Sequence, residues 1–145
     1  MRVLLDTNIL IHREARTVVR EDIGSLFRWL DELKCQKCVH PSSIEEIRKH
    51  TDRTVVHTFE TKLSSYSVLR TLARDTSEIA QLRSLDATRN DSVDTSLLAE
   101  LAAERVDALI TEDRGIHAKA VTIGLGQNVY TIDSFLEKVV AENPG

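Results

Sequence analysis

Long hydrophobic runs and aromatic residues are both scarce in this chain of 145 residues. No apolar stretch reaches the roughly 18 residues that a membrane-spanning helix needs, so we expect no membrane span. The chain has one Trp, two Tyr and three Phe residues, which argues against a surface on which single-stranded nucleic-acid bases stack. No signal-peptide pattern precedes the first apolar stretch, so we expect a cytoplasmic protein.

Cysteines are also few, and the two present, Cys35 and Cys38, form a Cys-x-x-Cys pair. A zinc site needs about four ligands, and only His40 lies close by in the sequence. A redox pair is expected at the start of a helix that follows a strand, whereas this pair follows a predicted helix. We therefore expect two reduced structural cysteines.

The rest of the composition is that of an ordinary globular protein, with 41% hydrophobic and 29% charged residues. The length fits a single domain over residues 1–145. The ending Asn143-Pro144-Gly145 is also compatible with a cut domain boundary in a longer protein. The net charge of −4 neither indicates nor excludes nucleic-acid binding, because a carboxylate cluster concentrates negative charge in one place.

Short apolar stretches alternate with helical periodicity along the chain. Buried strands are predicted for Val3–Leu5, around Val39, for 108–110 and for 128–132, while 68–72 fits either a strand or a helix end. Amphipathic patterns predict helices over 22–34, from Ser42, over 52–65, over 77–86, from Asn90, over 114–123 and over 134–141. Strands that alternate with helices predict a parallel sheet covered on both faces, which is an α/β fold.

Two of the predicted helices begin with capping signals. Ser42 with Glu45, or Ser43 with Glu46, fits the capping box, in which side chains satisfy the free amides of the first turn. The glutamate that does not close the box is then free to turn toward other groups. Asn90 fits the N-cap of the later helix.

Four acidic residues occupy comparable places: Asp6 and Asp113 follow apolar strands, and Glu46 and Asp94 lie in the first turns of helices. Ligands of open α/β sheets bind beyond the carboxyl ends of the strands, where these side chains would converge. Several clustered carboxylates stay ionised only beside a cation, and hard oxygen ligands suit Mg²⁺ or Mn²⁺. The pattern therefore predicts metal-assisted attack of water on a phosphodiester.

Each acid also has a simpler interpretation. Asp6 fits a turn cap, and Asp113 fits the N-cap of the helix that follows it. Asp91 lies one helical turn before Asp94 and favours the positive end of the helix dipole. One of these two aspartates is then a ligand and the other stabilises the helix.

With these motifs the chain resembles the PIN domain family (PilT N-terminus). The resemblance covers essentially the whole chain and is carried by Leu5-Asp6-Thr7-Asn8, by Glu46-Ile47 after Pro41, and by Asp94 before Thr111-Glu112-Asp113. It implies a three-layer α/β/α fold, an Mg²⁺- or Mn²⁺-dependent ribonuclease activity and often a homodimer.

The resemblance also implies roles for particular residues. The metal-binding acids would be Asp6, Glu46, Asp94 and Asp113. Glu45 and Asp91 are the departures from the family pattern, since they offer alternative or additional ligands beside two of these acids. Asn8 and Thr111 would support the acids by hydrogen bonding.

RNA phosphates are bound by Lys or Arg side chains, which are needed near the acids. The candidates are the basic residues that follow the motifs: Arg13, Arg16, Arg48, Lys49 and Arg114. Each is equally explained as a solvated surface charge. His12, His50 and His117 also lie near the motifs, but water activated by a metal ion needs no histidine base.

Other functions remain open. A PIN-like module that binds RNA or protein without cutting shares the fold, but degenerate members lose the acids, and all four are present here. Toxins of the PIN family, each held by an antitoxin, resemble this chain in the order of their motifs. A receiver-like phosphoacceptor domain requires a Lys after a late strand, where this chain has Thr111-Glu112-Asp113. We therefore predict a metal-dependent endoribonuclease, with its RNA and any action on DNA undetermined.

Overall fold

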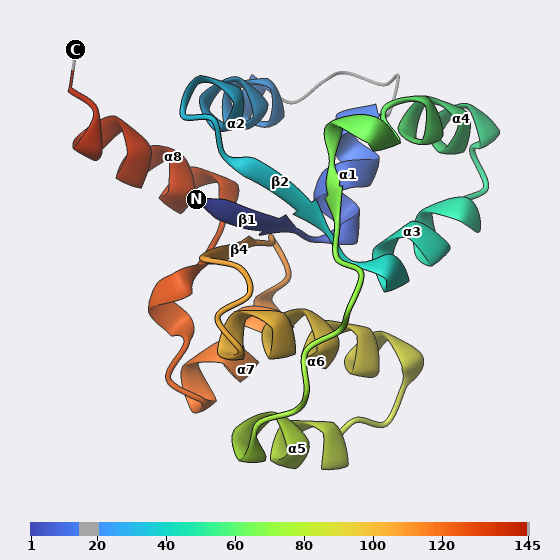
Figure 1. Cartoon of the computed structure of the whole chain (residues 1–145), viewed down its shortest axis with the longest axis vertical. Helices are drawn as coiled ribbons and strands as arrows, with labels where there is room; N and C mark the ends of the chain where they lie inside the picture. Colours follow the sequence, from blue (N-terminus) through green and yellow to red (C-terminus); the bar gives the residue numbers. More distant parts are fainter. Residues whose placement is uncertain (15–20, 145) are drawn as a thin grey trace.

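A parallel β-sheet forms the centre of the computed structural model, which describes residues 1–14 and 21–144 (Figure 1). Within these residues the sheet has five strands in the order β3-β2-β1-β4-β5, and every neighbouring pair is parallel. The strands are β1 (Arg2–Leu5), β2 (Gln36–Val39), β3 (Ser67–Val68), β4 (Ala108–Ile110) and β5 (Val129–Tyr130). Of the stretch 68–72, which fitted either a strand or a helix end, only Val68 lies in a strand, the edge strand β3, and residues 69–72 form neither element.

Helices cover both faces of this sheet, so the predicted three-layer α/β/α fold is confirmed. They are α1 (Thr7–Glu14), α2 (Glu21–Glu32), α3 (Pro41–Arg48), α4 (Arg53–Thr61), α5 (Ser77–Ser84), α6 (Arg89–Ala102), α7 (Arg114–Thr122) and α8 (Ile132–Glu142). In Figure 1, α2 and α8 lie on one side of the sheet, and α5, α6 and α7 lie on the other. Throughout the described residues, every helix is too short or too polar to cross a membrane.

The central strand β1 divides the hydrophobic core into two clusters, because side chains alternate across a strand. Val3 and Leu5 pack with residues of α1, α2, α3, α4 and α8, including Phe27, Phe59 and Phe135. Leu4 packs on the opposite face with residues of α5, α6 and α7. All three β1 side chains are completely buried, which explains the unbroken apolar run at this point of the sequence.

The register of β1 and β4 determines where the first two motifs meet. Leu5 pairs with Ile110, so the next residues, Asp6 and Thr111, leave the sheet side by side. Two further hydrogen bonds continue the pairing past the strand ends, from the Asp6 amide to Ile110 O and from the Thr111 amide to Tyr130 O. The carboxyl ends of neighbouring strands therefore present polar residues at one edge.

Both predicted capping assignments are wrong. The N-cap of α3 is His40, whose Nδ1 accepts from the Ser42 amide at 3.1 Å, because Pro41 occupies the first helical position and starts the helix earlier. The N-cap of α6 is Thr88 rather than Asn90, and Asp91 closes its capping box. Both helices thus start at least one residue earlier than the polar pattern indicated.

Candidate active site at the carboxyl edge of the sheet

Asp6 is held in place by the two threonines of its own and the neighbouring motif. The residue is buried, with only 7% of its surface exposed. Oδ1 accepts the Thr7 amide at 2.7 Å, and Oδ2 accepts the Thr111 hydroxyl at 2.6 Å. The Thr111 hydroxyl also accepts the Asp113 amide at 3.0 Å. Thr111 therefore hydrogen-bonds to Asp6, the kind of contact that the family resemblance implies, and connects it to the backbone of the last acid.

Asp113 is the N-cap of α7, as its simpler interpretation proposed. Its Oδ1 accepts the amides of Gly115 at 2.7 Å and Ile116 at 3.2 Å. A Cβ at position 115 would lie 3.0 Å from this oxygen, so glycine allows the close approach. Oδ2 has no hydrogen bond to any described residue. One oxygen thus orients the side chain and the other is left to face a ligand.

The two glutamates of α3 point to different surroundings. Glu45 is exposed and its Oε2 lies 3.0 Å from Arg89 Nη2, in an ion pair between the surfaces of α3 and α6. Glu46 is partly buried and lines a hollow together with Asp6. The start of α3 is fastened by the Thr7 hydroxyl, which donates to Ser43 Oγ at 2.9 Å. The geometry therefore places Glu46, and not Glu45, beside the other acids.

The two aspartates of α6, Asp91 and Asp94, also differ in their surroundings. Asp91 Oδ2 accepts the amides of Ala87 and Thr88, both at 3.2 Å. These bonds lower the pKa of Asp91, the Ala87 amide most strongly. Asp94, one turn later, lines the hollow with Asp6, whereas Asp91 does not. Asp91 thus serves the start of the helix, and Asp94 is the aspartate that faces the site.

Two adjoining hollows open at this edge of the sheet. The first has a volume of about 180 Å³ and is lined by Asp6, Thr7, Asn8, Glu46, Asn90, Val93, Asp94 and Asp113. The second has a volume of about 160 Å³ and is lined by Asp6, Asn8, Ile9, His12, Glu112 and Asp113. Asn8 lies on the shared wall, but its side chain has no hydrogen bond to an acid among the described residues. Of the two residues expected to support the acids, Thr111 has a side-chain hydrogen bond to Asp6, and the second bond to Asp6 comes from the Thr7 amide.

The acids of the first hollow make each other harder to ionise. Burial is the main cause of the raised pKa of Asp6, with smaller contributions from Asp113 and Glu46, and the bonds from Thr111 and Thr7 act against it. The pKa of Asp94 is raised to about 7, again mainly by burial and then by the charges of Asp113 and Asp6, with Lys119 acting against it. A cation in the hollow would offset both causes.

The fit of a divalent metal ion can be judged from these donors. Among the described residues, no group of three or more His, Cys, Asp or Glu side chains is close enough to enclose an ion. Mg²⁺ does not require such a cage, since it commonly takes one or two carboxylates and keeps several waters. The first hollow has room for an ion with waters, because one water occupies about 30 Å³ of liquid volume. The donor set therefore fits a hydrated Mg²⁺ or Mn²⁺ ion.

The basic residues predicted to bind RNA have different surroundings. The Arg13 guanidinium lies 4.8 Å from the centre of the Phe27 ring, and Arg48 Nε lies 2.8 Å from Glu60 Oε1. Lys49 and Arg114 are exposed, and neither side chain has a partner in the described part of the chain. Arg16 lies outside the described residues. Two of the five candidates are thus free to bind a phosphate.

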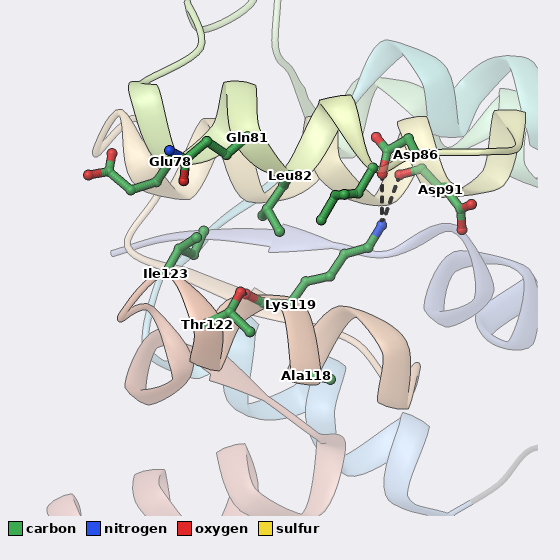
Figure 2. Close-up of a pocket in the computed structure, with 10 residues that line it drawn as sticks. Glu78, Gln81, Leu82, Asp86, Asp91, Ala118, Lys119, Thr122 and Ile123 are labelled. Atoms are coloured by element: carbon green, nitrogen blue, oxygen red, sulfur yellow. Dashed lines mark hydrogen bonds and ion pairs between the residues drawn. The ribbon is translucent and has the colours of Figure 1, made fainter.

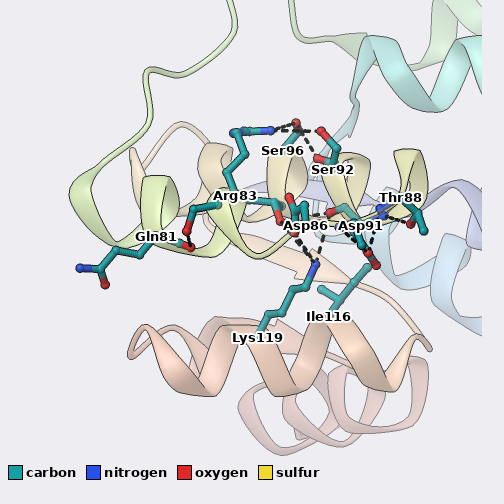
Figure 3. A network of polar contacts seen from close by, with 12 residues as sticks. Gln81, Arg83, Asp86, Thr88, Asp91, Ser92, Ser96, Ile116 and Lys119 are labelled. Atoms are coloured by element: carbon teal, nitrogen blue, oxygen red, sulfur yellow. Dashed lines mark hydrogen bonds and ion pairs between the residues drawn. The ribbon is translucent and has the colours of Figure 1, made fainter.

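A lysine that the sequence did not single out fastens the helix that carries Asp94. Lys119 Nζ, on α7, lies 3.3 Å from Asp86 Oδ1, 3.3 Å from the Asp91 carbonyl and 3.4 Å from Thr95 Oγ1 (Figure 3). Lys119 thereby connects α7 to the turn of α6 that includes Asp94. Its partners lie 24 to 33 residues away in the sequence, so no local pattern identifies it.

A larger cavity lies elsewhere, between α5 and α7 (Figure 2). It has a volume of about 500 Å³, and its walls are mainly apolar, with Leu82, Leu85 and Ile123 among the lining residues. Lys119 and Asp86 lie at one end of it, already bonded to each other. Catalysis requires convergent polar groups, so we place the candidate active site in the smaller acidic hollows.

The sequence matches no known family model and no curated protein. Its structure is similar to a chain in the crystal structure of VapBC2 from Rickettsia felis bound to a DNA fragment from their promoter, with a TM-score of 0.60. The identity is 15%, and the match covers 90% of this chain and 97% of that one. A likeness at this identity shows the fold, so any function must be argued from the site.

Proposed function

We propose that this chain is a metal-dependent endoribonuclease of the PIN type. The observation that carries the proposal is that Asp6, Glu46, Asp94 and Asp113, from four separate segments, line one hollow at the carboxyl edge of the sheet. None of the four forms an ion pair with a cationic side chain among the described residues. Carboxylates gathered without a protein cation are suited to receive an external one.

The chain's own residues would orient both the ion and the substrate. Mg²⁺ or Mn²⁺ bound in the hollow would polarise a phosphoryl oxygen and help to deprotonate the attacking water. Thr7 and Thr111 fix the Asp6 carboxylate, and the first amides of α7 fix Asp113. The exposed Lys49 and Arg114 would bind neighbouring phosphates, which position a nucleic acid without reading its sequence.

The test is cleavage of mixed single-stranded RNAs, and of DNA in parallel, with Mn²⁺, Mg²⁺ or EDTA. Wild type is compared with Asp6→Asn and with a matched pair of neighbours, Glu46→Gln and Glu45→Gln. We expect metal-dependent RNA cleavage that is lost in the Asp6 and Glu46 variants, by more than about 100-fold, because even partners of metal ligands are worth 10- to 100-fold. The Glu45 variant should keep its activity.

Two results would contradict this proposal in different ways. Cleavage that is equally strong with Asp6→Asn would show that the acids are not the catalytic groups. Absence of both cleavage and Mn²⁺ binding by calorimetry would favour the alternative of a PIN-like module that binds RNA or protein without cutting. Circular dichroism of each variant verifies that the fold is retained.

A second candidate function is that of a toxin held by an antitoxin. The observation that favours it is the likeness in fold to a chain of VapBC2, a complex that was crystallised with DNA from their promoter. Induced expression of the wild type should then arrest bacterial growth, whereas Asp6→Asn should not. Growth that is unaffected by the wild type would count against this role.

Formation of a homodimer and a cytoplasmic location remain predictions.

A further inference from the structure

The second hollow at the acidic edge contains a residue that the proposed nuclease mechanism has not yet used. It shares Asp6, Asn8 and Asp113 with the first hollow, and His12 is among its other lining residues. Asn8 and His12 are four residues apart on α1, so they lie on the same face of that helix. The His12 side chain is exposed and has no hydrogen bond to any described residue. It is therefore free to meet a substrate.

The other side chains of the two hollows are poor sources of a proton. The acids of the first hollow would be ionised when a cation is bound, and Glu112 Oε1 already accepts the Ile132 amide at 3.0 Å. Imidazole is the side chain that most readily gives and takes a proton near neutral pH. Of the residues that line the hollows, His12 alone is a histidine.

The remaining histidines near the motifs are engaged elsewhere. His117 Nε2 lies 2.8 Å from the Thr111 carbonyl, which orients the loop before α7. His50 Nδ1 accepts the Asp52 amide at 3.1 Å at the start of α4. Neither lines the acidic hollows. These contacts distinguish His12 from His50 and His117, although all three histidines lie near the motifs in the sequence.

Hydrolysis of a phosphodiester requires two groups on opposite sides of the phosphorus. The oxygen of the attacking water and the oxygen of the leaving ribose lie roughly in line through the phosphorus. Here the two hollows adjoin across the wall formed by Asp6, Asn8 and Asp113. A phosphate placed at this wall would have its water on the side of Glu46 and Asp94 and its leaving oxygen on the side of His12.

We propose that His12 is the proton donor to the leaving ribose oxygen, an inference that rests on the proposed nuclease function. The water oxygen forms a bond to phosphorus and gives up one proton to solvent. The bond between phosphorus and the ribose oxygen breaks, and that oxygen receives one proton from the imidazolium of His12. Solvent then returns a proton to His12, so that the net change is the addition of one water across the bond.

The experiment compares two substrates that differ in their need for this proton. In RNA the leaving group is a ribose oxygen, which is strongly basic and therefore needs a proton. In a p-nitrophenyl ester of a nucleotide the leaving group is nitrophenolate, which departs without a proton. Both are hydrolysed with Mn²⁺ by wild type, His12→Gln and a matched control, His57→Gln. His57 is also an exposed histidine on a helix, α4, and it does not line the hollows.

We expect His12→Gln to slow RNA cleavage by about 100-fold or more, because general acid catalysis is typically worth 10²- to 10⁴-fold. The same variant should hydrolyse the nitrophenyl ester at the wild-type rate and bind Mn²⁺ with unchanged affinity by calorimetry. The His57 variant should match the wild type on both substrates.

The other outcomes overturn the assignment. Equal losses on both substrates would exclude proton donation, and a weaker affinity for Mn²⁺ would make His12 a metal ligand instead. Wild-type activity of His12→Gln on RNA would show that the residue has no catalytic role. A wild type that hydrolyses neither substrate would overturn the nuclease function itself, which is distinct from a failure confined to His12.

Discussion

The molecule contains two kinds of buried carboxylate, and they differ in what faces them. The side chains of Glu14 and Glu100 are 1% exposed and that of Asp86 is 7% exposed, and each has a cationic partner. The partners are Lys62 at 3.0 Å, Arg105 at 3.2 Å and Lys119 at 3.3 Å respectively. Asp6 is buried as well, yet it has no cationic partner in the described part of the chain.

This difference separates structural acids from candidate functional ones. A buried charge with a cation beside it is neutralised within the fold, and removal of the cation destabilises the protein. A buried carboxylate that faces other carboxylates instead carries an unfavourable interaction that an external cation would relieve. Burial alone therefore does not distinguish the candidate site, whereas burial without a cationic partner does.

Among the tests of this comparison, the largest effect is expected from removing the hydroxyl that donates to Asp6, the buried carboxylate without a cationic partner. Thr111→Val keeps the shape of the side chain but loses the bond to Asp6 Oδ2 and the bond from the Asp113 amide. We expect a 10- to 100-fold loss of Mn²⁺ affinity, the typical value for a group that orients a metal ligand. Calorimetry measures it, with Thr111→Ser as the control that keeps the hydroxyl. Equal affinity of the Val and Ser variants would contradict the supporting role.

Removal of the cation from a paired carboxylate should mainly affect stability. Lys119→Met leaves the Asp86 carboxylate without its ion pair, while Thr95 still donates a hydrogen bond to it at 3.1 Å. We expect the free energy of unfolding in urea to fall by about 1–3 kcal/mol. Lys138→Met, which removes an exposed pair with Glu142 on α8, should change it by less than about 0.5 kcal/mol. A similar loss of unfolding free energy in the two variants would contradict the distinction between buried and surface ion pairs.

The unpaired acids should also give stability a characteristic dependence on pH. The folded protein holds a proton on Asp94 up to its pKa of about 7, whereas the unfolded chain releases it near 3.8. Because the folded state then binds more protons, stability from this group is present below pH 4 and is lost as the pH rises toward and through 7. Asp94→Asn cannot ionise, so its stability relative to the wild type should be greater at pH 8 than at pH 5. Urea unfolding at the two pH values, without metal, measures this; a constant difference would contradict the raised pKa.

The smallest effects are expected at the rim of the site. Arg114→Ala and Lys49→Ala each remove an exposed cation without a protein partner, so RNA affinity should fall and the dependence of log K on log salt should weaken by about one unit. Arg48→Ala is the control, since that guanidinium is already paired with Glu60. Fluorescence anisotropy in a salt series, in Ca²⁺ to prevent cleavage, distinguishes the variants. Equal losses at Arg48 and Arg114 would show that pairing does not decide phosphate contact.

The layered fold and the edge at which the acids gather could both be predicted from local patterns. Val3, Leu4 and Leu5 form a short apolar run that ends in Asp6, and this pattern correctly predicted a buried parallel strand. Helical periodicity similarly predicted α2 within two residues at each end. These features depend on near neighbours in the sequence, where the repeat of apolar residues directly reflects the geometry of the backbone.

Residues with two plausible roles could not be resolved in this way. Glu45 and Glu46 are adjacent, and the predicted capping box assigned their roles through Ser42 or Ser43. In the structure Pro41 begins the helix, and its N-cap is His40, at least two residues before the predicted caps. The same holds for Asp91 and Asp94, since the true cap, Thr88, lies two residues before the predicted one. A shift of one or two residues at a helix start turns a side chain by 100 degrees or more, because the helix has 3.6 residues per turn.

By itself, the sequence determined the α/β class, the order of the strands along the chain and the set of acids that we propose as metal ligands. Only the tertiary structure decided which acids share a hollow, which basic residues are already paired, and that His12 rather than His50 or His117 lines the hollow beside Asp6. The physical reason is distance along the chain. The bond from Thr111 to Asp6 spans 105 residues and that from Lys119 to Asp86 spans 33, and such contacts arise from the packing of whole elements and leave no local pattern.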